Sequence, residues 1–591
     1  MAQNATSSHE SLPVILAAAV GQGWALFGLH HAITTHTWPA TDLAWLLALY
    51  SVVVLIPVTI QLLAGQMRGQ AASAIVALLT VAVFYFGWHH GSAVADFHDN
   101  RFAESGECFP LAIVLIVLWL QVMPFVQARL RMGRWTADYH PLFDYAWRNA
   151  ITLAEAGAFT GLFWLLLFLW QSLFHMLRID FFRDLFQQPI FVYPVTSLVF
   201  GCALHLIGSV ERLVSTVLEQ ILNVFKWLGT VSGLLLALFT VALIFRLPSL
   251  IFTGEKAIGA SWLLWLVAVV VLFLNAAYRD GSVSKPYPAW MAFSLRIVIP
   301  LTVIVALTAT YALVLRTREY GLTVERFWGF IVAAAALIYA IGYALAAAGK
   351  GAWFAGISRV NVIAALALIG ALALALTPVL SPYRLSADSQ YTLVMEGRFK
   401  PADDRHRSGS PFHYLRFGSG AYGRHKLAEL AQLQNHPDAA LIRALASAEL
   451  RLTSPWETVP QEPAANALAK MVIYPPGRTL DAELSQRLRA DMDAPGRRYM
   501  WTSAADAPIA GLFVDLSTEG SGAEEFVLLN GANGVVYRKD ARGWREIGLA
   551  NGAPSAVTQQ RLLAELARGD VSVRDPEWKE LWVGSYRIRV Q

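Results

Sequence analysis

The chain has 591 residues, of which 56% are hydrophobic and 15% are charged, whereas soluble domains are about a quarter charged. This composition excludes an ordinary soluble protein and predicts an integral membrane protein. The formal net charge is only +4, so no basic surface argues for nucleic acid as a partner. Only Cys108 and Cys202 are present, which excludes a disulfide framework and a thiolate metal site.

Charged residues are concentrated in the last third of the chain. Residues 381–591 contain 26 of the 46 Lys and Arg residues and 25 of the 42 Asp and Glu residues. A lipid-embedded region holds few charges because charged side chains are costly in hydrocarbon. We therefore predict a transmembrane helical domain over 1–380 and a soluble extracytoplasmic α+β domain over 381–591.

Long apolar runs follow one another through the first 380 residues. A helix needs about 20 mainly apolar residues to cross the roughly 30 Å hydrocarbon core of a bilayer. About eleven runs reach this length, so we expect a polytopic α-helical bundle whose first run is a retained span and not a cleaved signal. The runs lie near 12–33, 43–65, 71–89, 109–128, 149–177, 189–209, 227–246, 260–278, 290–315, 327–347 and 359–380.

Arginines in the loops predict the orientation of this bundle. Cytoplasmic loops carry an excess of Lys and Arg. The strongest cluster consists of Arg129, Arg131, Arg134 and Arg148. If this cluster is cytoplasmic, the N-terminus is cytoplasmic too, and eleven spans place the C-terminal domain in the periplasm of a bacterial cell. One span more or fewer would place the C-terminal domain on the cytoplasmic side instead.

The region after residue 380 has a different pattern. Polar residues over 384–410 predict an extended or loop region, and helical periodicity follows at 422–433, 437–450 and 480–491. Short β-favouring runs separated by Gly- and Asn-rich turns then predict a small antiparallel β-meander. The strands are expected near 511–515, 525–529, 534–537 and 544–547, followed by a helix at 555–568 and a last strand at 581–590.

A hydrophilic turn at 316–326 separates two of the expected spans. Its arginines can pair with Glu319 and Glu325 or bind lipid phosphates through two hydrogen bonds each. Two interpretations stay open: a structured turn that anchors two helices at the membrane interface, or a surface on which the C-terminal domain or a ligand docks. The candidate residues are Arg316, Tyr320, Gly321, Thr323, Glu325 and Arg326, together with Asn361 in the last span.

The same region resembles a known family of bacterial polytopic membrane proteins, DUF4153. The similarity rests on Tyr311, Arg316, the run from Tyr320 to Thr323, Arg326 and Asn361. It continues after the last span, in the run from Ser381 to Gln390, in Tyr414-Leu-Arg-Phe417 and in Gly420-Ala-Tyr-Gly423. The resemblance implies a multi-pass membrane protein and brings no established activity with it.

Histidines and acidic residues gather on the expected outer face. His89, His90, Asp96, His98 and Asp99 lie close together between two spans. Imidazole combined with carboxylate suits Zn, Ni, Cu or Fe, but the spacing matches no closed tetrahedral motif. A metal site is one interpretation, and polar capping of a span at headgroup level is the other.

Glu155 is the one carboxylate well inside an expected span, and His175 and His205 are its candidate partners. Ionisable groups inside the membrane are costly and often mark an ion or proton route. The alternative is a position near the interface, because Arg148 lies only about two helical turns away.

Motifs for the common enzyme classes give little support to catalysis. The run from Asp515 to Glu524 resembles a calcium-binding loop, but Ser517 and Glu519 replace the usual ligands, so a plain β-turn is favoured. No phosphate-binding loop, nucleophile elbow, zinc-protease motif or dinucleotide fingerprint occurs in a supporting context. We expect no cofactor.

These observations favour a non-enzymatic inner-membrane protein that displays a periplasmic domain for interaction or sensing in the cell envelope. The expected partners are membrane lipids and other envelope proteins that contact residues 381–591. One alternative is an ion- or proton-coupled transporter that uses Glu155 and the outer-face histidines. Another is a membrane enzyme that acts on lipid-linked substrates. For this alternative the first outer loop offers only Asp42, and the second outer loop offers Asp96 and Asp99.

Overall fold

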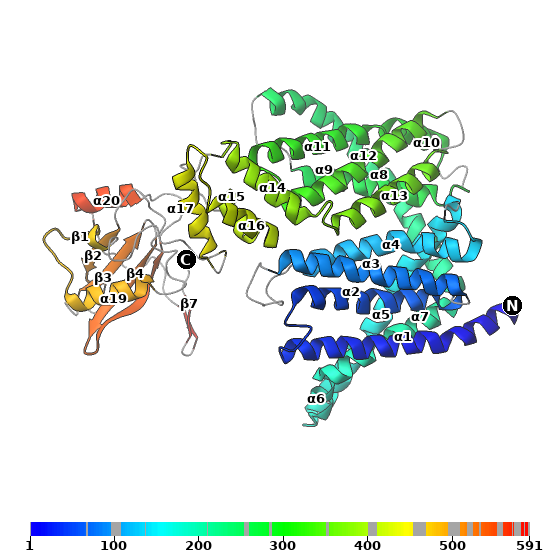
Figure 1. Ribbon diagram of the computed structural model, residues 1–591, viewed down its shortest axis with the longest axis horizontal. Helices are drawn as coiled ribbons and strands as arrows, with labels where there is room; N and C mark the ends of the chain where they lie inside the picture. The colour runs from blue at the N-terminus through cyan, green and yellow to red at the C-terminus, as the bar shows by residue number, and fades with distance from the viewer. Residues whose placement is uncertain are drawn as a thin grey trace. The chain divides into compact units, whose positions relative to one another are not determined.

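A computed structural model provides the structure of the chain (Figure 1). It describes residues 2–66, 69–95, 108–135, 138–209, 211–252, 259–282, 287–349, 354–399, 410–452, 455, 468–493, 509–516, 524–530, 533–551, 559–569, 571, 581–583 and 586–588. The chain divides into two compact units, Met1–Leu450 and Arg451–Gln591. The sequence places a boundary at 380, where the apolar runs end, whereas packing extends the first unit through the helices that follow the last span.

Eleven helical segments in the described chain are long and apolar enough to cross a membrane, which confirms the expected polytopic bundle. The 3-10 helix η1 (Ala64–Gln66) ends the second segment, and the short helix α6 (Phe181–Gln187) lies between the fifth and sixth segments. The segments are formed by α1 (Ala2–Thr34), α2 (Leu43–Leu63), α3 (Gln70–Val94), α4 (Cys108–Met132), α5 (Tyr139–Met176), α7 (Pro189–Ser209), α8 (Glu211–Phe252), α9 (Ala260–Tyr278), α10 (Ala289–Val298) with α11 (Leu301–Tyr320), α12 (Val324–Ala348) and α13 (Ile357–Ala375).

One span is built from two helices. α10 ends at Val298 and α11 begins at Leu301, and Pro300 lies between them. Proline has no N–H to donate and its ring clashes with the preceding turn, so it interrupts a helix. Both helices belong to the single apolar segment Ala289–Tyr320, so the interruption does not add a span.

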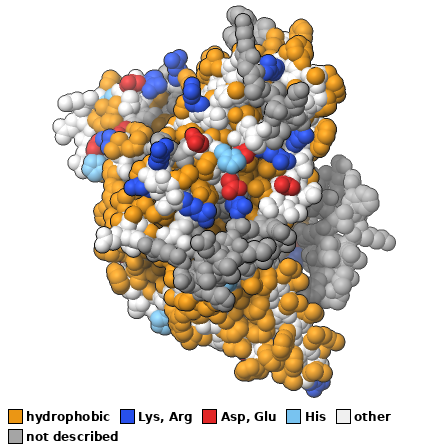
Figure 2. Space-filling model, turned by 90° about the vertical axis from the view of Figure 1, so that its right-hand side faces the viewer, with side chains coloured by type: hydrophobic (Ala, Val, Ile, Leu, Met, Phe, Trp, Pro, Cys, Tyr) orange, Lys and Arg blue, Asp and Glu red, His pale blue; other side chains and the backbone are white. Residues whose placement is uncertain are grey.

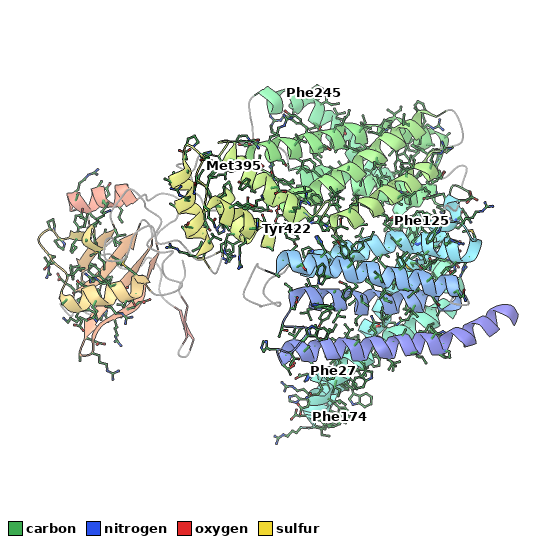
Figure 3. All side chains as sticks on the ribbon, in the orientation of Figure 1. Phe27, Phe125, Phe174, Phe245, Met395 and Tyr422 are labelled. Atoms are coloured by element: carbon green, nitrogen blue, oxygen red, sulfur yellow. The ribbon has the colours of Figure 1, made fainter. Side chains whose placement is uncertain are left out.

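Large apolar side chains cover the outside of the bundle. Phe245 on α8 is 81% exposed (Figure 3), and Met176 at the end of α5 is 80% exposed. In each of the eleven spans only 17–50% of the most apolar window is buried within the protein. Water would not tolerate contiguous apolar surface of this extent, so lipid is the solvent that this surface requires.

Two hydrophobic cores divide the bundle into two helix groups (Figure 1). One core joins α2, α3 and α4 to the end of α13, and it includes Leu47 and Met123. The other joins α8 to α12 and the start of α13, and it includes Val267 and Val305. α13 therefore belongs to both groups and connects them.

A layer of helices follows the last span within the first unit. The layer consists of α14 (Pro382–Met395), α15 (Pro411–Phe417), α16 (Gly420–Leu430) and α17 (Ala439–Leu450). Its core includes Ala387, Phe412 and Leu427, with Met395 packed against it (Figure 3). Tyr422 contacts this core and also the core of α2, α3 and α4. The layer is therefore packed directly onto the bundle.

Helix α14 corrects the prediction of an extended or loop region over 384–410. Pro382 begins the helix, where its missing N–H has no helical partner to lose. One face of α14 is buried at spacings of three and four residues, as in an amphipathic helix. That face combines small and polar residues with aromatic ones, so its hydropathy is low and the pattern is not visible in sequence. The buried residues are Tyr383, Ala387, Gln390 and Val394.

The second unit contains a five-stranded mixed sheet in the order β1-β2-β3-β4-β5. Its strands are β1 (Val472–Tyr474), β2 (Ala510–Val514), β3 (Glu525–Asn530), β4 (Asn533–Asp540) and β5 (Gly543–Asn551). β2 to β5 pair antiparallel in chain order, which confirms the predicted meander, and β1 adds a parallel strand beside β2. Phe526, Leu528 and Tyr537 are fully buried where the sheet packs against α19 (Ala482–Asp493).

The end of the second unit differs in part from prediction. Helix α20 (Gln559–Arg568) lies within the expected range 555–568, and its Leu566 packs against Tyr474 and Ala510 of the sheet. The single strand expected at 581–590 is a pair of short antiparallel strands, β6 (Leu581–Val583) and β7 (Tyr586–Ile588).

Candidate functional site: an intramembrane cavity and a helix junction

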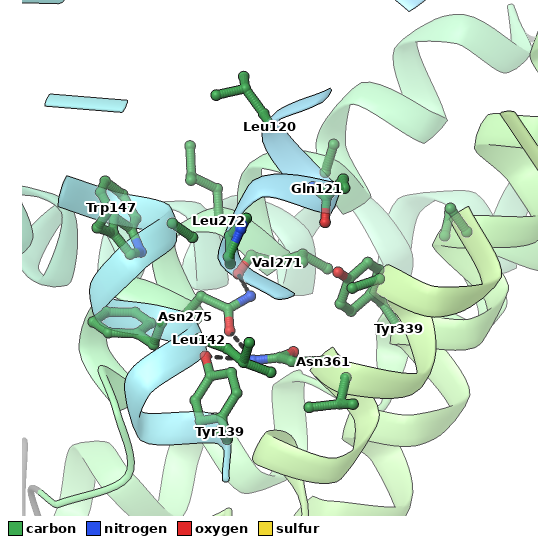
Figure 4. Close-up of a pocket in the computed structure, with 18 of the residues that line it drawn as sticks. Leu120, Gln121, Tyr139, Leu142, Trp147, Val271, Leu272, Asn275, Tyr339 and Asn361 are labelled. Atoms are coloured by element: carbon green, nitrogen blue, oxygen red, sulfur yellow. Dashed lines mark hydrogen bonds between the residues drawn. The ribbon is translucent and has the colours of Figure 1, made fainter. Parts of the chain in front are cut away.

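A cavity of about 400 Å³ lies between the two helix groups of the bundle (Figure 4). α4 and α5 form one side, and α9, α12 and α13 form the other. The volume falls within the range of small-molecule sites, about 300–1,000 Å³. Most of the lining is apolar, and among the described residues it contains no acidic, basic or histidine side chain. Its polar members are Gln121, Tyr139, Trp147, Asn275, Tyr339 and Asn361.

A closed ring of hydrogen bonds forms the base of the cavity. Tyr343 Oη donates to Asn361 Oδ1 at 2.6 Å. Asn361 Nδ2 donates to Asn275 Oδ1 at 2.6 Å, and Asn275 Nδ2 donates to Tyr343 Oη at 2.8 Å. Asn361 Nδ2 also donates to Tyr139 Oη at 2.7 Å, as Figure 4 shows. Because the four side chains come from four different helices, these bonds hold α5, α9, α12 and α13 in one arrangement.

Three polar groups of the cavity keep unused hydrogen-bonding capacity. Within the described chain, the Tyr339 hydroxyl and the Gln121 amide make no hydrogen bond. The Tyr139 hydroxyl accepts from Asn361 but donates to no described residue. Neutral groups of this kind, in an otherwise apolar cavity, suit a ligand with a hydrocarbon body and a few polar atoms.

The turn at 316–326 is a tight connection between α11 and α12. Gly321 has a φ of +74°, a conformation that glycine adopts without strain. Thr323 caps α12, since its hydroxyl accepts from the Arg326 backbone N–H at 3.3 Å. Arg326 Nη1 donates to the Gly321 carbonyl at 2.5 Å, and its guanidinium carbon lies 5.7 Å from the centre of the Tyr320 ring.

Side chains of α14 and α15 bind the free amides of this turn. The Leu322 N–H donates to Ser389 Oγ at 2.9 Å, and the Val324 N–H donates to Tyr414 Oη at 2.7 Å. Burial raises the pKa of Tyr414 to about 12, so the hydroxyl is neutral at physiological pH. The two amides lie at the N-terminus of α12, where a helix has no partners of its own for its first N–H groups.

Further bonds join the turn carbonyls to α14 and to the residues just after it. Gln390 Nε2 donates to the Tyr320 carbonyl at 3.0 Å and to the Leu322 carbonyl at 3.1 Å. Arg398 Nη1 donates to the Arg318 carbonyl at 3.2 Å. The predicted contact between the turn and residues after Ser381 is therefore present.

The structure separates the predicted residues of the turn into two places. Tyr320, Gly321, Thr323 and Arg326 meet at the junction with α14 and α15, and Arg316 and Glu325 are exposed on the flanking helices. Asn361 lies apart from them, in the hydrogen-bonded ring of the cavity.

Glu155 lies on α5, and its Oε2 atom is buried without a hydrogen-bond partner in the described chain. Trp164 Nε1 on α5 donates to Thr196 Oγ1 on α7 at 3.0 Å. Glu155 lies nine residues before Trp164 on α5, and His205 lies nine residues after Thr196 on α7. Because the two helices are consecutive spans that run in opposite directions, Glu155 and His205 lie at the same level in the bundle.

A buried amide on α2 lies near the same level and was missed in the sequence. Both amide atoms of Gln61 are buried and make no hydrogen bond in the described chain, and the residue is only 4% exposed. Its neighbour Leu62 packs in one small core with Ala156 and Leu204, the neighbours of Glu155 and His205. Unpaired buried polar groups are uncommon in native structures.

The histidine cluster is only partly described. His89 and His90 are buried at the end of α3, and the His90 ring lies 5.5 Å from the Tyr383 ring of α14. Asp96, His98 and Asp99 lie outside the described residues, as do Ser517 and Glu519 of the predicted turn at 515–524. In the part of the chain that the structure describes, no group of three or more His, Cys, Asp or Glu residues could hold a metal ion.

Sequence reasoning missed three members of the cavity ring: Tyr139, Asn275 and Tyr343. A signal existed for Asn275, because an amide inside the apolar run 260–278 usually faces another helix. The sequence could not supply its partners, since Asn361 is 86 residues from Asn275 and 222 residues from Tyr139.

No family model, no curated protein and no solved structure matches the chain. The resemblance to DUF4153 therefore stays a prediction from the residues alone. Function has to be argued from the cavity, the junction and the buried polar groups.

Proposed function

We propose that this multi-pass membrane protein is a non-enzymatic protein of the interaction or sensing class. Its bundle would hold the layer α14–α17, and with it the second unit, at one face of a bacterial inner membrane. The observation that supports this proposal is the junction, where side chains of α14 and α15 bond to the backbone at Tyr320, Leu322 and Val324.

The junction bonds argue for a fixed platform and against a free tether. Each bond contributes about 0.5–1.5 kcal/mol net, and four of them engage one short turn. A tether that only links two domains needs none of them. A partner bound to the layer would therefore act on α11 and α12 directly, which is what a sensing protein requires.

The proposal includes a sidedness and a set of partners. We assign the α14 end of the bundle to the periplasm because the cluster of Arg129, Arg131 and Arg134 lies at the end of α4, at the opposite end of the bundle. The partners would be membrane lipids and other envelope proteins that contact residues after 380. Membership in DUF4153 would agree with this role, although the family brings no established activity.

Site-directed photocrosslinking in native membranes tests the proposal. A photoreactive residue at Leu441, which is 40% exposed on α17, should give a discrete protein adduct. The matched control is Phe245 on the lipid-facing surface, which should give lipid adducts only. The absence of protein adducts at Leu441 and at the exposed Ile547 of β5 would contradict the proposal.

A second candidate function, ion- or proton-coupled transport, is favoured by the buried Oε2 atom of Glu155. Purified protein in liposomes would then show ion or proton flux, and Glu155→Gln would abolish that flux. His205→Gln should impair flux as well, because His205 lies at the same level on α7. Flux that is absent, or unchanged in both variants, removes this candidate.

The third candidate, an enzyme acting on lipid-linked substrates, has less support. Asp42 Oδ1 accepts from the Ala44 N–H at 2.9 Å and caps α2. This carboxylate is therefore engaged in helix capping, which explains its presence without catalysis.

A further inference from the structure

We propose that the intramembrane cavity binds one hydrocarbon chain of a phosphate-bearing membrane lipid, which enters sideways from the leaflet at the α4–α5 end. This end is where α4 and α9 finish and where α5 and α13 begin, at Met132, Tyr278, Tyr139 and Ile357. The proposal is independent of the interaction role, because it concerns the cavity and not the junction. Four features of the cavity support it: its depth, its opening, its unused polar groups and the charges beside it.

The cavity runs from one membrane face toward the middle of the bilayer. Tyr139 is the first residue of α5 and Asn275 lies three residues before the end of α9, so the polar base is at the level of the headgroups. Gln121 lies near the middle of α4, and Val332 lies nine residues into α12. At about 1.5 Å per residue, the eleven steps from Val332 to Tyr343 cover about 16 Å, roughly one leaflet.

The cavity opens to lipid through its side wall. Leu272 is 42% exposed and Val332 is 48% exposed, and both line the cavity. Both lie within membrane spans, where the exposed surface faces acyl chains. A ligand can therefore enter from the bilayer without passing through water. Burial of a methylene group contributes about 0.8 kcal/mol only when the group leaves water. A lipid chain that moves from the bilayer into the cavity leaves no water, so selectivity between lipids has to come from polar contacts.

The unused polar groups define what the lipid must offer. The Tyr139 hydroxyl needs an acceptor at the headgroup end, and the Tyr339 hydroxyl lies on α12, on the other side of the cavity. Ester carbonyl and glycerol oxygens of a lipid lie at this depth and are acceptors. In hydrocarbon an unmet donor is costly, so an occupant with such oxygens relieves a penalty that a plain hydrocarbon would leave.

Cations surround the mouth at the headgroup level. Figure 2 shows Lys and Arg side chains on this end of the molecule, with Asp, Glu and His side chains among them and apolar surface around them. Arg359 is exposed two residues before Asn361, and Arg279 directly follows Tyr278, whose ring lies 6.1 Å from the Tyr139 ring. Asp280 lies beside them, and its carboxylate contacts His140 Nδ1 at 2.5 Å. Basic pockets between spans suit phosphate headgroups.

Photolabelling of the full chain in lipid nanodiscs tests the proposal. The probe is phosphatidylglycerol with a diazirine near the end of one acyl chain, and labelled peptides are identified by mass spectrometry. We expect labelling concentrated on the cavity faces of α4 and α12. Unlabelled phosphatidylglycerol should compete better than phosphatidylcholine, and soluble glycerol phosphate should not compete.

Matched variants separate the chain site from general lipid contact. Ala335→Phe should fill the cavity and reduce labelling about tenfold, equivalent to about 1.4 kcal/mol of binding free energy. Ala334→Phe is the control, because Ala334 is exposed on the same helix and does not line the cavity. If Ala335→Phe does not fold, Val332→Phe at the open wall serves as the second variant.

A second pair of variants tests the headgroup. Arg359→Gln should reduce the advantage of phosphatidylglycerol over phosphatidylcholine about fivefold, while Arg178→Gln at the opposite end should not. Equal labelling of all lipid-facing helices, unchanged by cavity filling, would overturn the proposal. Competition by glycerol phosphate would show a soluble phosphate ligand instead, and an unchanged lipid preference in Arg359→Gln would overturn phosphate recognition.

Discussion

At the scale of single residues, Gly321 shows how one backbone conformation serves two contacts. Its φ of +74° turns the chain so that the Leu322 and Val324 amides face Ser389 and Tyr414. A Cβ atom at this position would lie 2.6 Å from Gln390 Nε2. The glycine is therefore required both for its dihedral angle and for the close approach of α14.

Substitution of Gly321 by Ala should destabilise the first unit by about 1–3 kcal/mol from the backbone conformation alone, because a φ of 74° with a ψ of 172° is essentially confined to glycine, and the clash adds a further cost. In a Gln390→Ala background the clash is absent, so the same substitution should cost less. Thermal unfolding in detergent measures both effects. Gly370→Ala is the control, because a Cβ there meets nothing within 4 Å. Equal costs in the two backgrounds would show that Gln390 does not crowd this position.

Sequence reasoning at this scale found residues but not their partners. The resemblance identified Tyr320, Gly321, Arg326 and Asn361 as notable positions, and the first three do meet at one junction. Asn361 bonds instead to side chains from three other helices. Residue type indicates that a polar group needs a partner, but only the packing of helices decides which one it meets.

At the scale of secondary-structure elements, the N-terminus of α19 depends on Asp481. Its Oδ1 atom accepts from the Leu484 N–H at 2.6 Å, and its Oδ2 atom accepts from Trp544 Nε1 at 2.9 Å and from Lys539 Nζ at 3.1 Å. Burial acts to raise the pKa of Asp481, but these hydrogen bonds outweigh it and hold the pKa below its usual value of 3.8.

The lowered pKa of Asp481 predicts a pH dependence of α19. A carboxyl group whose pKa is lower in the folded state than in the unfolded state stabilises the folded state at any pH above its usual pKa. This stabilisation is lost as the pH falls through the folded-state pKa. Asp481→Ala should therefore cost about 1 kcal/mol at pH 7 and much less once the pH is below the folded-state pKa, which is itself lower than 3.8.

Hydrogen exchange of the α19 amides, corrected for intrinsic rates, measures this change in the full chain. Protection should fall about fivefold at pH 7 in Asp481→Ala. Gln486→Ala is the control and should have little effect, because Gln486 is exposed on α19 and makes no hydrogen bond within the described chain. A difference between wild type and Asp481→Ala that persists at low pH would contradict the prediction.

The elements also show where periodicity is a reliable guide. The spans and the strands β2 to β5 were predicted because burial in lipid or in a sheet requires long or alternating apolar patterns. α14 was missed because its buried face includes Gln390, a polar residue that is buried through its bonds to the turn. Helices stabilised by specific polar contacts leave a weak pattern.

At the scale of the whole molecule, the number of spans decides which loops share a side. Ser282 follows α9, and Val379 follows α13, three spans later. Three crossings place the two positions on opposite sides of the membrane. The arginine distribution adds that Val379 should be periplasmic and Ser282 cytoplasmic.

Cysteine labelling checks this topology directly. With Cys108 and Cys202 replaced by Ser, a membrane-impermeant maleimide should label Val379→Cys in intact cells and Ser282→Cys only after permeabilisation. A reporter fused after Gln591 should report the side of Val379. Labelling of both cysteines from one side would contradict the span count, and exchanged sides would contradict only the orientation.

The sequence by itself determined the class of this protein, its eleven spans and the antiparallel meander β2 to β5 of its second unit. These features follow from local composition, because a segment in lipid must be apolar over its whole length and a strand with one buried face must alternate apolar and polar residues. Only the tertiary structure decided that Asn275, Tyr343 and Asn361 close one ring to which Tyr139 bonds, and that α14 and α15 bond to the turn. Such contacts join residues that are distant in the chain, so they depend on how helices pack and not on any local pattern.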